Sequence, residues 1–201
     1  MTARVASLRP DLVRTWAGGN GPISAEYVRH PLAEAWQDPV AGDRSMSELE
    51  PETLVHDGVT GVDVPVGAAR EMVGRMDNPM KDSILRLYRS ARTMGAAWEP
   101  ALSRVSTPCL VFWGALDPAR GIEFGERLGA TLRADEIVGL GCNHWTVLQR
   151  PAEVATVLEV HGGRHAGRWC PGRRAGGRGE RDRCPCRMCV VTPCPTRVAT
   201  A

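Results

Sequence analysis

The sequence predicts an α/β fold with about three parallel strands, a mostly helical insertion and a disordered C-terminal tail. A continuous apolar run occupies residues 109–113 between Pro108 and Gly114, and such a run suits a strand buried on both faces. Segments of strand and helix character then alternate up to residue 160, which is typical of a parallel layer joined by right-handed crossovers. Beyond residue 160 the composition changes abruptly, which separates the tail from the folded part.

The composition divides the chain into two segments. Its 201 residues are 43% hydrophobic and carry a formal net charge of +2. Residues 1–160 hold 16 basic and 21 acidic side chains, whereas residues 161–201 hold nine basic and two acidic ones, together with five of the seven cysteines. The first segment therefore has the makeup of a folded domain, and we expect the Arg-, Gly- and Cys-rich segment 161–201 to be disordered.

The sequence also predicts where the chain resides. No apolar run reaches the roughly 18 to 20 residues that cross a bilayer, and the first 13 residues include Arg4, Arg9 and Asp11 instead of an apolar signal core. Cys109 and Cys142 are isolated in the first 160 residues, which indicates reduced thiols. We therefore expect a cytoplasmic protein that does not bind membranes, and its oligomeric state stays open.

The N-terminal half begins with a short strand and continues in helices. The β-leaning run Leu12 to Ala17 precedes a Gly-rich break at residues 18–21, as a strand feeding a loop would. Residues 22–98 then show helical spacing of apolar side chains, and Asn78 with Pro79 supplies a cap and a first-turn proline for the second helix. Two helical faces are expected, formed by Ala69, Met72, Val73 and Met76 and by Met80, Ile84, Leu87, Tyr88 and Ala91.

After residue 98 the pattern becomes strand, helix, strand, loop and helix. The buried strand at residues 109–113 is followed by a helix with apolar residues at 124, 128 and 132 and by a short strand from Glu136 to Leu140. A last helix begins at Pro151. In this order the loops after the two strands meet at the carboxyl edge of the sheet, where functional residues collect.

Each of these two loops contains a candidate catalytic residue. Asp117 is the first ionisable side chain after the buried strand, and His144 follows the next strand in the loop Gly141-Cys142-Asn143-His144. An aspartate and a histidine in this order fit the acid and base of a catalytic triad, in which the carboxylate fixes the imidazole tautomer and the imidazole moves the proton. We therefore select Asp117 and His144 as the candidate catalytic pair.

These loops resemble those of the α/β-hydrolase family, whose last two core strands usually end in a G-x-x-D loop and a G-x-x-H loop. Here the loops read GALD at residues 114–117 and GCNH at residues 141–144. The RPAEV segment at residues 150–154 is similar to the Pro-initiated helix that follows in the family. The resemblance implies a partial α/β-hydrolase fold in this chain.

The resemblance also assigns the segments of the chain. It implies that residues 1–21 are the end of the helix behind the nucleophile and the following core strand. Residues 22–98 would be the helical cap over the active site, and residues 99–160 the C-terminal part of the core. Residues 161–201 lie outside the resemblance.

The family's nucleophile turn is missing. It has the form G-x-(S/D/C)-x-G, in which the glycines permit a strained backbone, and no such pentapeptide occurs in the sequence. Ser7 is the serine nearest to the expected place, and its neighbours Val5 and Arg9 replace the glycines. We therefore expect a truncated chain, with the natural protein starting further upstream, that is inactive by itself.

In a completed enzyme the resemblance implies hydrolysis of an ester, amide, epoxide or carbon–halogen bond by a Ser or Asp nucleophile. His144 would activate the nucleophile or a water, and Asp117 would orient His144. No metal ligand, cofactor or nucleic-acid partner is expected. The substrate would be a small apolar organic molecule, and the candidate lining residues are Trp145, Trp36, Tyr27, Met72, Met76 and Met94.

Two other functions stay open. A non-catalytic binding or interaction protein would retain the helical segment and half of the sheet, and the absent nucleophile turn favours it. The tail provides the second alternative, because Cys184, Cys186, Cys189 and Cys194 offer four thiolates for zinc, with Cys170 in reserve and nine arginines for nucleic acid. However, structural zinc sites normally separate two cysteine pairs by a longer loop.

Overall fold

A computed structural model describes residues 2–21, 23–27 and 29–166, and within them three strands form one parallel sheet. The strands are β1 (Trp16–Gly19), β2 (Cys109–Gly114) and β3 (Glu136–Leu140), in the spatial order β1-β2-β3. The register pairs Trp16 with Cys109 and Gly114 with Leu140. The predicted α/β class with three parallel strands is confirmed.

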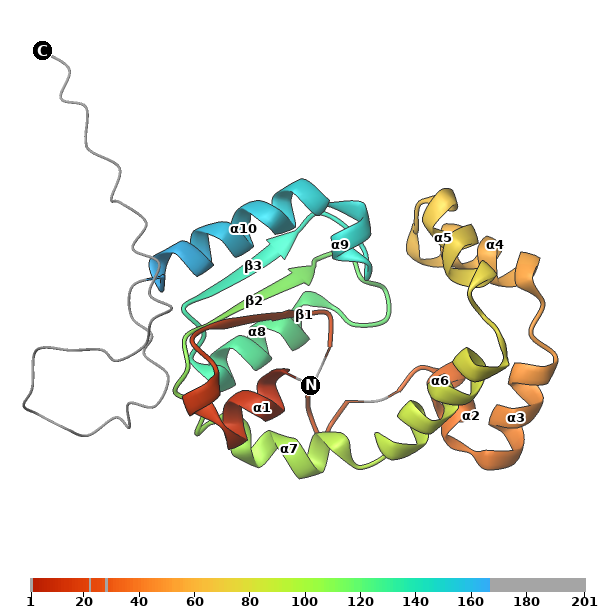
Figure 1. Cartoon of the computed structure of the whole chain (residues 1–201), viewed down its shortest axis with the longest axis horizontal. Helices are drawn as coiled ribbons and strands as arrows, with labels where there is room; N and C mark the ends of the chain where they lie inside the picture. The colour runs from red at the N-terminus through yellow and green to blue at the C-terminus, as the bar shows by residue number, and fades with distance from the viewer. Residues whose placement is uncertain (1, 22, 28, 167–201) are drawn as a thin grey trace, which may run out of the picture.

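Helices cover both faces of this sheet (Figure 1). Two apolar clusters show which side chains make the contacts. On one face Val111 and Trp113 of β2 pack with side chains of α1 (Thr2–Leu8) and α8 (Ile122–Leu132). On the other face Phe112 packs with Leu140 and with Val154 of α10 (Pro151–Arg164). β2 is therefore buried on both faces, as its unbroken apolar run predicts.

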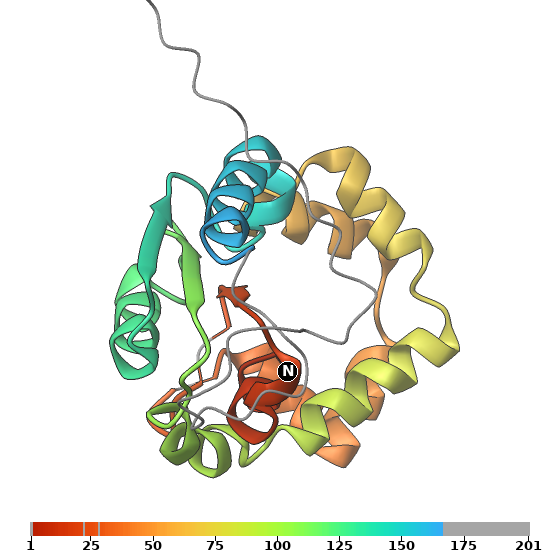
Figure 2. The same ribbon diagram turned by 60° about the vertical axis from the view of Figure 1, so that its left-hand side comes forward.

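The remaining helices lie mostly between β1 and β2 in the chain. They form an arc that runs from the loop after β1 around one side of the sheet and back to β2 (Figures 1 and 2). This helical segment, α2 to α7, consists of α2 (Pro31–Gln37), α3 (Pro39–Ser47), α4 (Pro51–Val62), α5 (Val66–Gly74), α6 (Asn78–Ser90) and α7 (Met94–Leu102). A 3-10 turn, Pro10–Leu12, precedes β1, and the short helix α9 (Thr146–Gln149) precedes α10.

The expected position of the first strand was wrong. Leu12 lies in the 3-10 turn that Pro10 begins, and the strand spans Trp16–Gly19 in place of residues 12–17. Gly18 and Gly19 pair with Val111 and Phe112 of β2. A side chain at Gly19 would overlap Phe112. Glycine is usually unfavourable in a strand, but at position 19 its lack of a side chain is what allows β1 to pair with β2.

Three helix ends also differ from expectation. Met76 lies beyond α5, which ends at Gly74, so it does not extend that helical face. The N-cap of α6 is Asp77, whose carboxylate accepts the Met80 N–H at 2.9 Å, and Asn78 is the first helical residue. The last helix begins at Pro151 as expected, but it continues to Arg164, past the expected start of the tail at residue 161.

The five cysteines and eight of the nine arginines proposed as a zinc or nucleic-acid module lie in segment 167–201, outside the described residues. The ninth arginine, Arg164, lies in α10 and forms an ion pair with Glu136. None of the described helices is both long and apolar enough to cross a bilayer.

Candidate functional site

The structure brings Asp117 and His144 together at the carboxyl edge of the sheet. Asp117 follows β2 and His144 follows β3, and these strands are parallel neighbours. The Nδ1 atom of His144 lies 2.7 Å from Oδ2 of Asp117. The two residues, 27 positions apart in the sequence, therefore form a hydrogen-bonded pair because the crossover through α8 returns the chain beside β2.

Asp117 is buried and fully hydrogen-bonded. Its Oδ1 accepts the backbone N–H groups of Ala119 at 2.9 Å and Arg120 at 3.0 Å, and its Oδ2 accepts the amide of Asn20 at 3.0 Å. Burial acts to raise the pKa of this carboxyl, but the hydrogen bonds from His144, Asn20 and Ala119 outweigh it, so the pKa lies below its ordinary value. Asp117 is therefore an anion held in place to support His144.

Asn20 links β1 to this pair, although it is not among the candidate site residues predicted from the sequence. Its side-chain oxygen accepts the Gly114 N–H at 3.1 Å while its amide donates to Asp117. Its backbone has φ 48°, and asparagine adopts this left-handed conformation more readily than most residues. The sequence does offer a local indication of its role, because Asn20 is the only polar side chain in the Gly-rich break at residues 18–21 that follows the first strand.

Gly114 allows the two loops to meet. Any side chain at this position would overlap the carbonyl of Asn143, which precedes His144. The loops are further joined by hydrogen bonds from the Ala115 N–H to the Leu140 carbonyl at 2.8 Å and from the Leu116 N–H to the Cys142 carbonyl at 3.0 Å. The GALD loop therefore requires glycine at position 114 because a larger residue would not fit. The backbone hydrogen bonds between the loops fix the separation of Asp117 from His144.

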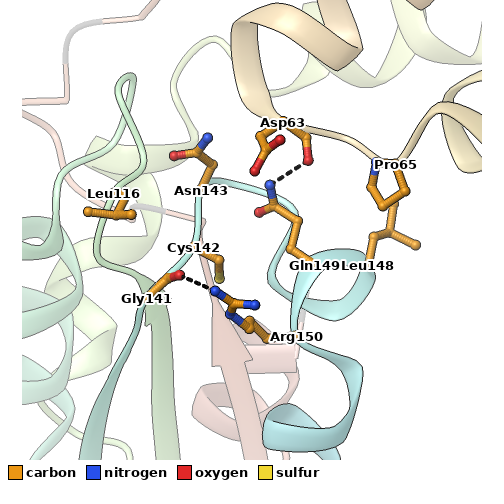
Figure 3. A pocket seen from close by; sticks show the side chains of 9 residues that line it. All are labelled: Asp63, Pro65, Leu116, Gly141, Cys142, Asn143, Leu148, Gln149 and Arg150. Atoms are coloured by element: carbon orange, nitrogen blue, oxygen red, sulfur yellow. Dashed lines mark hydrogen bonds between the residues drawn. The ribbon is translucent and has the colours of Figure 1, made fainter.

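Two further contacts lie beside the histidine loop, one made by Gln149 at the end of α9 and one by Arg150, which follows it (Figure 3). The guanidinium of Arg150 donates to the Gly141 carbonyl at 3.0 Å, and the Gln149 amide donates to the Asp63 carbonyl of the helical segment at 2.7 Å. These residues line an open hollow of about 370 Å³ together with Cys142. Neither Asp117 nor His144 belongs to its lining, so this hollow is not the candidate site.

His144 lines a different cavity, of about 220 Å³. It lies between the sheet edge and the helical segment, because its lining includes residues of the loop after β1 and of α2, α6 and α7. The lining residues are Asn20, Gly21, Ser24, Tyr27, Arg29, Ala33, Gln37, Tyr88, Ala91, Met94, Gly95, Arg120 and His144. Tyr27 and Met94 were among the expected lining residues, whereas Arg29 and Arg120 were not selected.

The two tryptophans selected as substrate contacts pack against residues that line this cavity. Trp36 packs edge-to-face on Tyr88, with ring centroids 4.9 Å apart, and its indole N–H donates to Ser45 at 3.3 Å. Trp145 packs edge-to-face on His144, with centroids 5.6 Å apart. Neither is among the residues that line the cavity at His144, and their role as substrate contacts stays a prediction.

This arrangement gives His144 the form of a base. Because Nδ1 donates its hydrogen to the anionic Asp117, the Nε2 atom carries a free lone pair. The His144 side chain is 24% exposed, whereas that of Asp117 is 0% exposed. The pair therefore has a solvent-reachable proton acceptor backed by a buried carboxylate. No side chain among the described residues stands on a G-x-(S/D/C)-x-G turn, since the sequence contains none.

The structure is similar to solved α/β-hydrolase structures. A hydrolase from Pseudomonas aeruginosa superposes with a TM-score of 0.61 at 17% identity, over 80% of this chain and 60% of that one. An α/β-hydrolase enzyme from a Medee basin deep-sea metagenome library gives 0.64 at 15% identity, over 81% and 60%. For 2-hydroxy-6-oxo-6-phenylhexa-2,4-dienoate hydrolase from a Rhodococcus strain the values are 0.60, 17%, 80% and 59%.

No protein-family model matches the sequence, and no curated protein sequence matches it. The chain spans about three fifths of the length of the solved structures named above. At this level of identity the similarity concerns the fold. The chain therefore has a partial α/β-hydrolase fold, with three parallel core strands and the two loops that bring Asp117 to His144.

Proposed function

We propose that this chain supplies the acid and base of an α/β-fold hydrolase. The observation that carries the proposal is the 2.7 Å hydrogen bond between His144 and a buried Asp117 that accepts three further hydrogen bonds. The cavity beside His144 supports it, because it gives the free Nε2 atom access to a small molecule. A histidine with a purely structural role in the core would not need to line a cavity.

In the proposed reaction His144 moves a proton at Nε2. A Ser or Asp nucleophile attacks the electrophilic carbon and forms a covalent intermediate while the bond to the leaving group breaks. Nε2 accepts the proton of a serine nucleophile, or of the water that later cleaves the intermediate, and Asp117 stabilises the resulting imidazolium. The bond cleaved is that of an ester, amide, epoxide or carbon–halogen compound.

The nucleophile is proposed to come from a part of the fold that this sequence does not include. Two observations support this. β1 pairs with β2 on one side and with no other strand among the described residues. Apolar side chains before β1 are also exposed: Val5 is 45%, Leu8 60% and Leu12 57% exposed. Further core strands beside β1 would cover such surface and would bring the nucleophile turn to His144.

The proposed substrate is a small organic molecule with an apolar part. Ala33, Ala91 and Met94 offer apolar contacts in the cavity at His144. Arg120 lines the same cavity, and its guanidinium lies 5.7 Å from the ring centroid of Tyr27. This cation is proposed to bind a polar or anionic group of the substrate, so that the reactive carbon lies near His144.

The proposed setting is the cytoplasm, with no nucleic-acid or membrane partner and no cofactor in the hydrolytic step. Cys109 and Cys142 support the location, because both are buried free thiols. Segment 22–98 is proposed to be the cap of the enzyme, and the cavity that it forms with the sheet edge supports this assignment.

The first test is the intact mass, with terminal peptides, of the native protein from its own cells. We expect a mass above 21.8 kDa and upstream peptides with a G-x-(S/D/C)-x-G turn. In that longer protein, His144→Ala should lower kcat for its substrate by about 10⁴-fold or more. His56→Ala, on the exposed surface of α4, is the matched control. Full activity in the His144→Ala enzyme would refute the proposed role.

For the 201-residue chain by itself we expect no catalysed hydrolysis. Its turnover of ester and epoxide substrates should equal that of the Asp117→Ala/His144→Ala double variant, because neither the nucleophile nor its oxyanion donor is present. A clear difference between the two proteins would mean that a nucleophile lies within these residues.

A binding function is the second candidate, and the missing nucleophile turn favours it. It requires the native protein to have a mass of 21.8 kDa and to be monodisperse without turnover. A small molecule that protects His144 from chemical modification would then identify the ligand.

A further inference from the structure

A second group of histidine and aspartate side chains lies at the opposite, amino edge of the sheet. Asp135 directly precedes β3, and His161 and His165 lie one helical turn apart at the end of α10. One ligand atom from each of the three residues lies within 4.8 Å of the others. In Figure 1 the end of α10 lies beside the start of β3, away from α9 and the loop after β2. We refer to these three residues as the Asp135 cluster.

The hydrogen bonds of His161 define its tautomer. The His161 side chain is 3% exposed, and its Nε2 is hydrogen-bonded to the hydroxyl of Thr15. That hydroxyl donates its only hydrogen to the carbonyl of Pro108 at 3.1 Å, so it must accept from His161. Nε2 therefore carries the hydrogen, and Nδ1 carries a lone pair.

This lone pair faces another acceptor. Nδ1 of His161 is buried and has no hydrogen-bond partner in the part of the chain that the structure describes, and Oδ2 of Asp135 lies 3.9 Å from it. The same Oδ2 is hydrogen-bonded to Nε2 of His165 at 2.9 Å. An unprotonated nitrogen and a carboxylate oxygen do not hydrogen-bond to each other, and leaving a buried acceptor unpaired is unfavourable. A cation among the three atoms would pair Nδ1 of His161 and would take the place of the hydrogen between His165 and Asp135.

We propose that the Asp135 cluster binds a zinc ion. Two imidazole nitrogens and one carboxylate oxygen form a ligand set that zinc uses, whereas magnesium and calcium prefer oxygen ligands. The hydrogen bond from Nε2 of His161 to Thr15 is of the kind that orients a metal-binding imidazole. Three protein ligands leave the fourth tetrahedral position for a water molecule.

The surroundings of the cluster fit this role. Asp135 is 39% and His165 13% exposed, so an ion can enter from solvent.

The proposed ion has a structural role. It joins the end of α10 to the residue before β3 and, through Thr15, to the segment before β1 and the carbonyl before β2. The Asp117–His144 pair is at the other edge of the same strands. Zinc at the Asp135 cluster therefore fixes α10 on the sheet without entering the hydrolytic site, and it is independent of the proposed hydrolase function.

The test must separate this cluster from the cysteines of the C-terminal segment. We would use the full chain and a full-length variant in which Cys170, Cys184, Cys186, Cys189 and Cys194 are serine, and titrate both with cobalt(II), a spectroscopic substitute for zinc. We call this variant thiol-free with reference to its C-terminal segment, because it keeps only the buried thiols of Cys109 and Cys142. The thiol-free variant should bind one equivalent with visible bands of nitrogen and oxygen ligation and without thiolate charge-transfer bands. Zinc should displace the cobalt.

Four further variants in the thiol-free chain identify the ligands. His165→Gln, at a partly exposed position, and Asp135→Asn should each weaken binding at least about 100-fold, because each removes one of three ligands. Thr15→Val, which removes only the hydrogen-bond partner of His161, should weaken it about 10- to 100-fold. His56→Gln, remote from the cluster, should bind like the parent.

The proposal fails if the folded thiol-free chain binds no cobalt at millimolar concentration. It also fails if binding persists unchanged in His165→Gln, or if only the cysteine-containing chain binds, since the metal would then belong to the thiols. Circular dichroism of each variant shows that it is folded, so a loss of binding is attributed to the missing ligand.

Discussion

The two histidine–aspartate groups lie at opposite ends of the same parallel strands and differ in how their polar atoms are satisfied. At the carboxyl edge, Asp117 accepts four hydrogen bonds and His144 faces a cavity. At the amino edge, Asp135 lies on the surface and His161 is buried with an unpaired Nδ1. In the first group donors surround both oxygens of the carboxylate, whereas in the second a buried ring nitrogen has no donor among the described residues.

This difference shows why residue type alone does not assign a function. A carboxylate surrounded by N–H groups stays anionic and orients an imidazole, which suits proton transfer. Acceptors that face one another favour a cation between them, which suits metal binding. The following predictions test the difference, beginning with the largest expected effect.

Removing Asp117 should destabilise the chain most. In Asp117→Ala the donors of Asn20, Ala119 and Arg120 lose their acceptor in a buried place, so the free energy of unfolding should fall by about 3–5 kcal/mol. His144→Ala leaves those donors satisfied and should cost about 1–2 kcal/mol. Urea unfolding of both variants measures the difference. Equal losses of unfolding free energy in the two variants would contradict the view that the hydrogen bonds of Asp117, more than those of His144, hold the loops at the carboxyl edge together.

Zinc should stabilise the amino edge. At a free zinc concentration 100 times the dissociation constant, the thiol-free chain should gain about 2.7 kcal/mol in the free energy of unfolding. His165→Gln should gain little, because the ion then lacks one ligand, whereas His144→Gln should gain as much as the parent. Thermal unfolding with and without zinc gives both values. An equal gain in His165→Gln would place the ion elsewhere.

The bridge from β1 to the carboxyl edge should contribute less. Asn20→Gly removes the two side-chain hydrogen bonds and keeps the left-handed backbone accessible, so it should cost about 1–3 kcal/mol. Asn20→Ala should cost about 1 kcal/mol more, since alanine resists φ 48°. Urea unfolding of the two variants separates the hydrogen bonds from the backbone preference. Equal costs would show that the backbone conformation is unimportant.

The smallest effect is the pH dependence of stability due to Asp117. Its pKa in the folded chain lies below the ordinary value of 3.8, so its contribution is present above that pH and is lost as the pH falls through the folded pKa. Asp117→Asn should therefore flatten the fall in unfolding free energy below pH 3.8. An unchanged pH profile in this variant would show that other carboxylates determine acid unfolding.

Local patterns predicted the central parts of the fold. The run at residues 109–113 gave β2, and Pro151 gave the start of α10, because burial on both faces and a fixed proline φ leave local signals. The first strand was placed too early, since its position depends on Gly19 pairing with Phe112, a contact between residues 93 positions apart. No local pattern contains that contact.

The candidate site was predicted in part for the same reason. Asp117 and His144 each follow a recognisable strand and could be selected, whereas Asn20 reaches the site only through tertiary contacts. Arg120 is close to Asp117 in the sequence, but the cavity that it lines is formed by residues distant from it in the sequence. The Asp135 cluster was missed because His161 and His165 lie where the sequence analysis expected the tail. Four residues apart on a helix, they share a face, but their partner Asp135 is distant in the sequence.

The sequence by itself determined the α/β class, the order of strands and helices after residue 98, and the two loops that end in Asp117 and His144. These properties follow from hydrophobic periodicity and from turn residues, which act over a few positions. Only the tertiary structure decided which acceptor each buried polar atom meets. That depends on strand register and crossover, and it is what distinguishes a proton-transfer pair from the proposed zinc site.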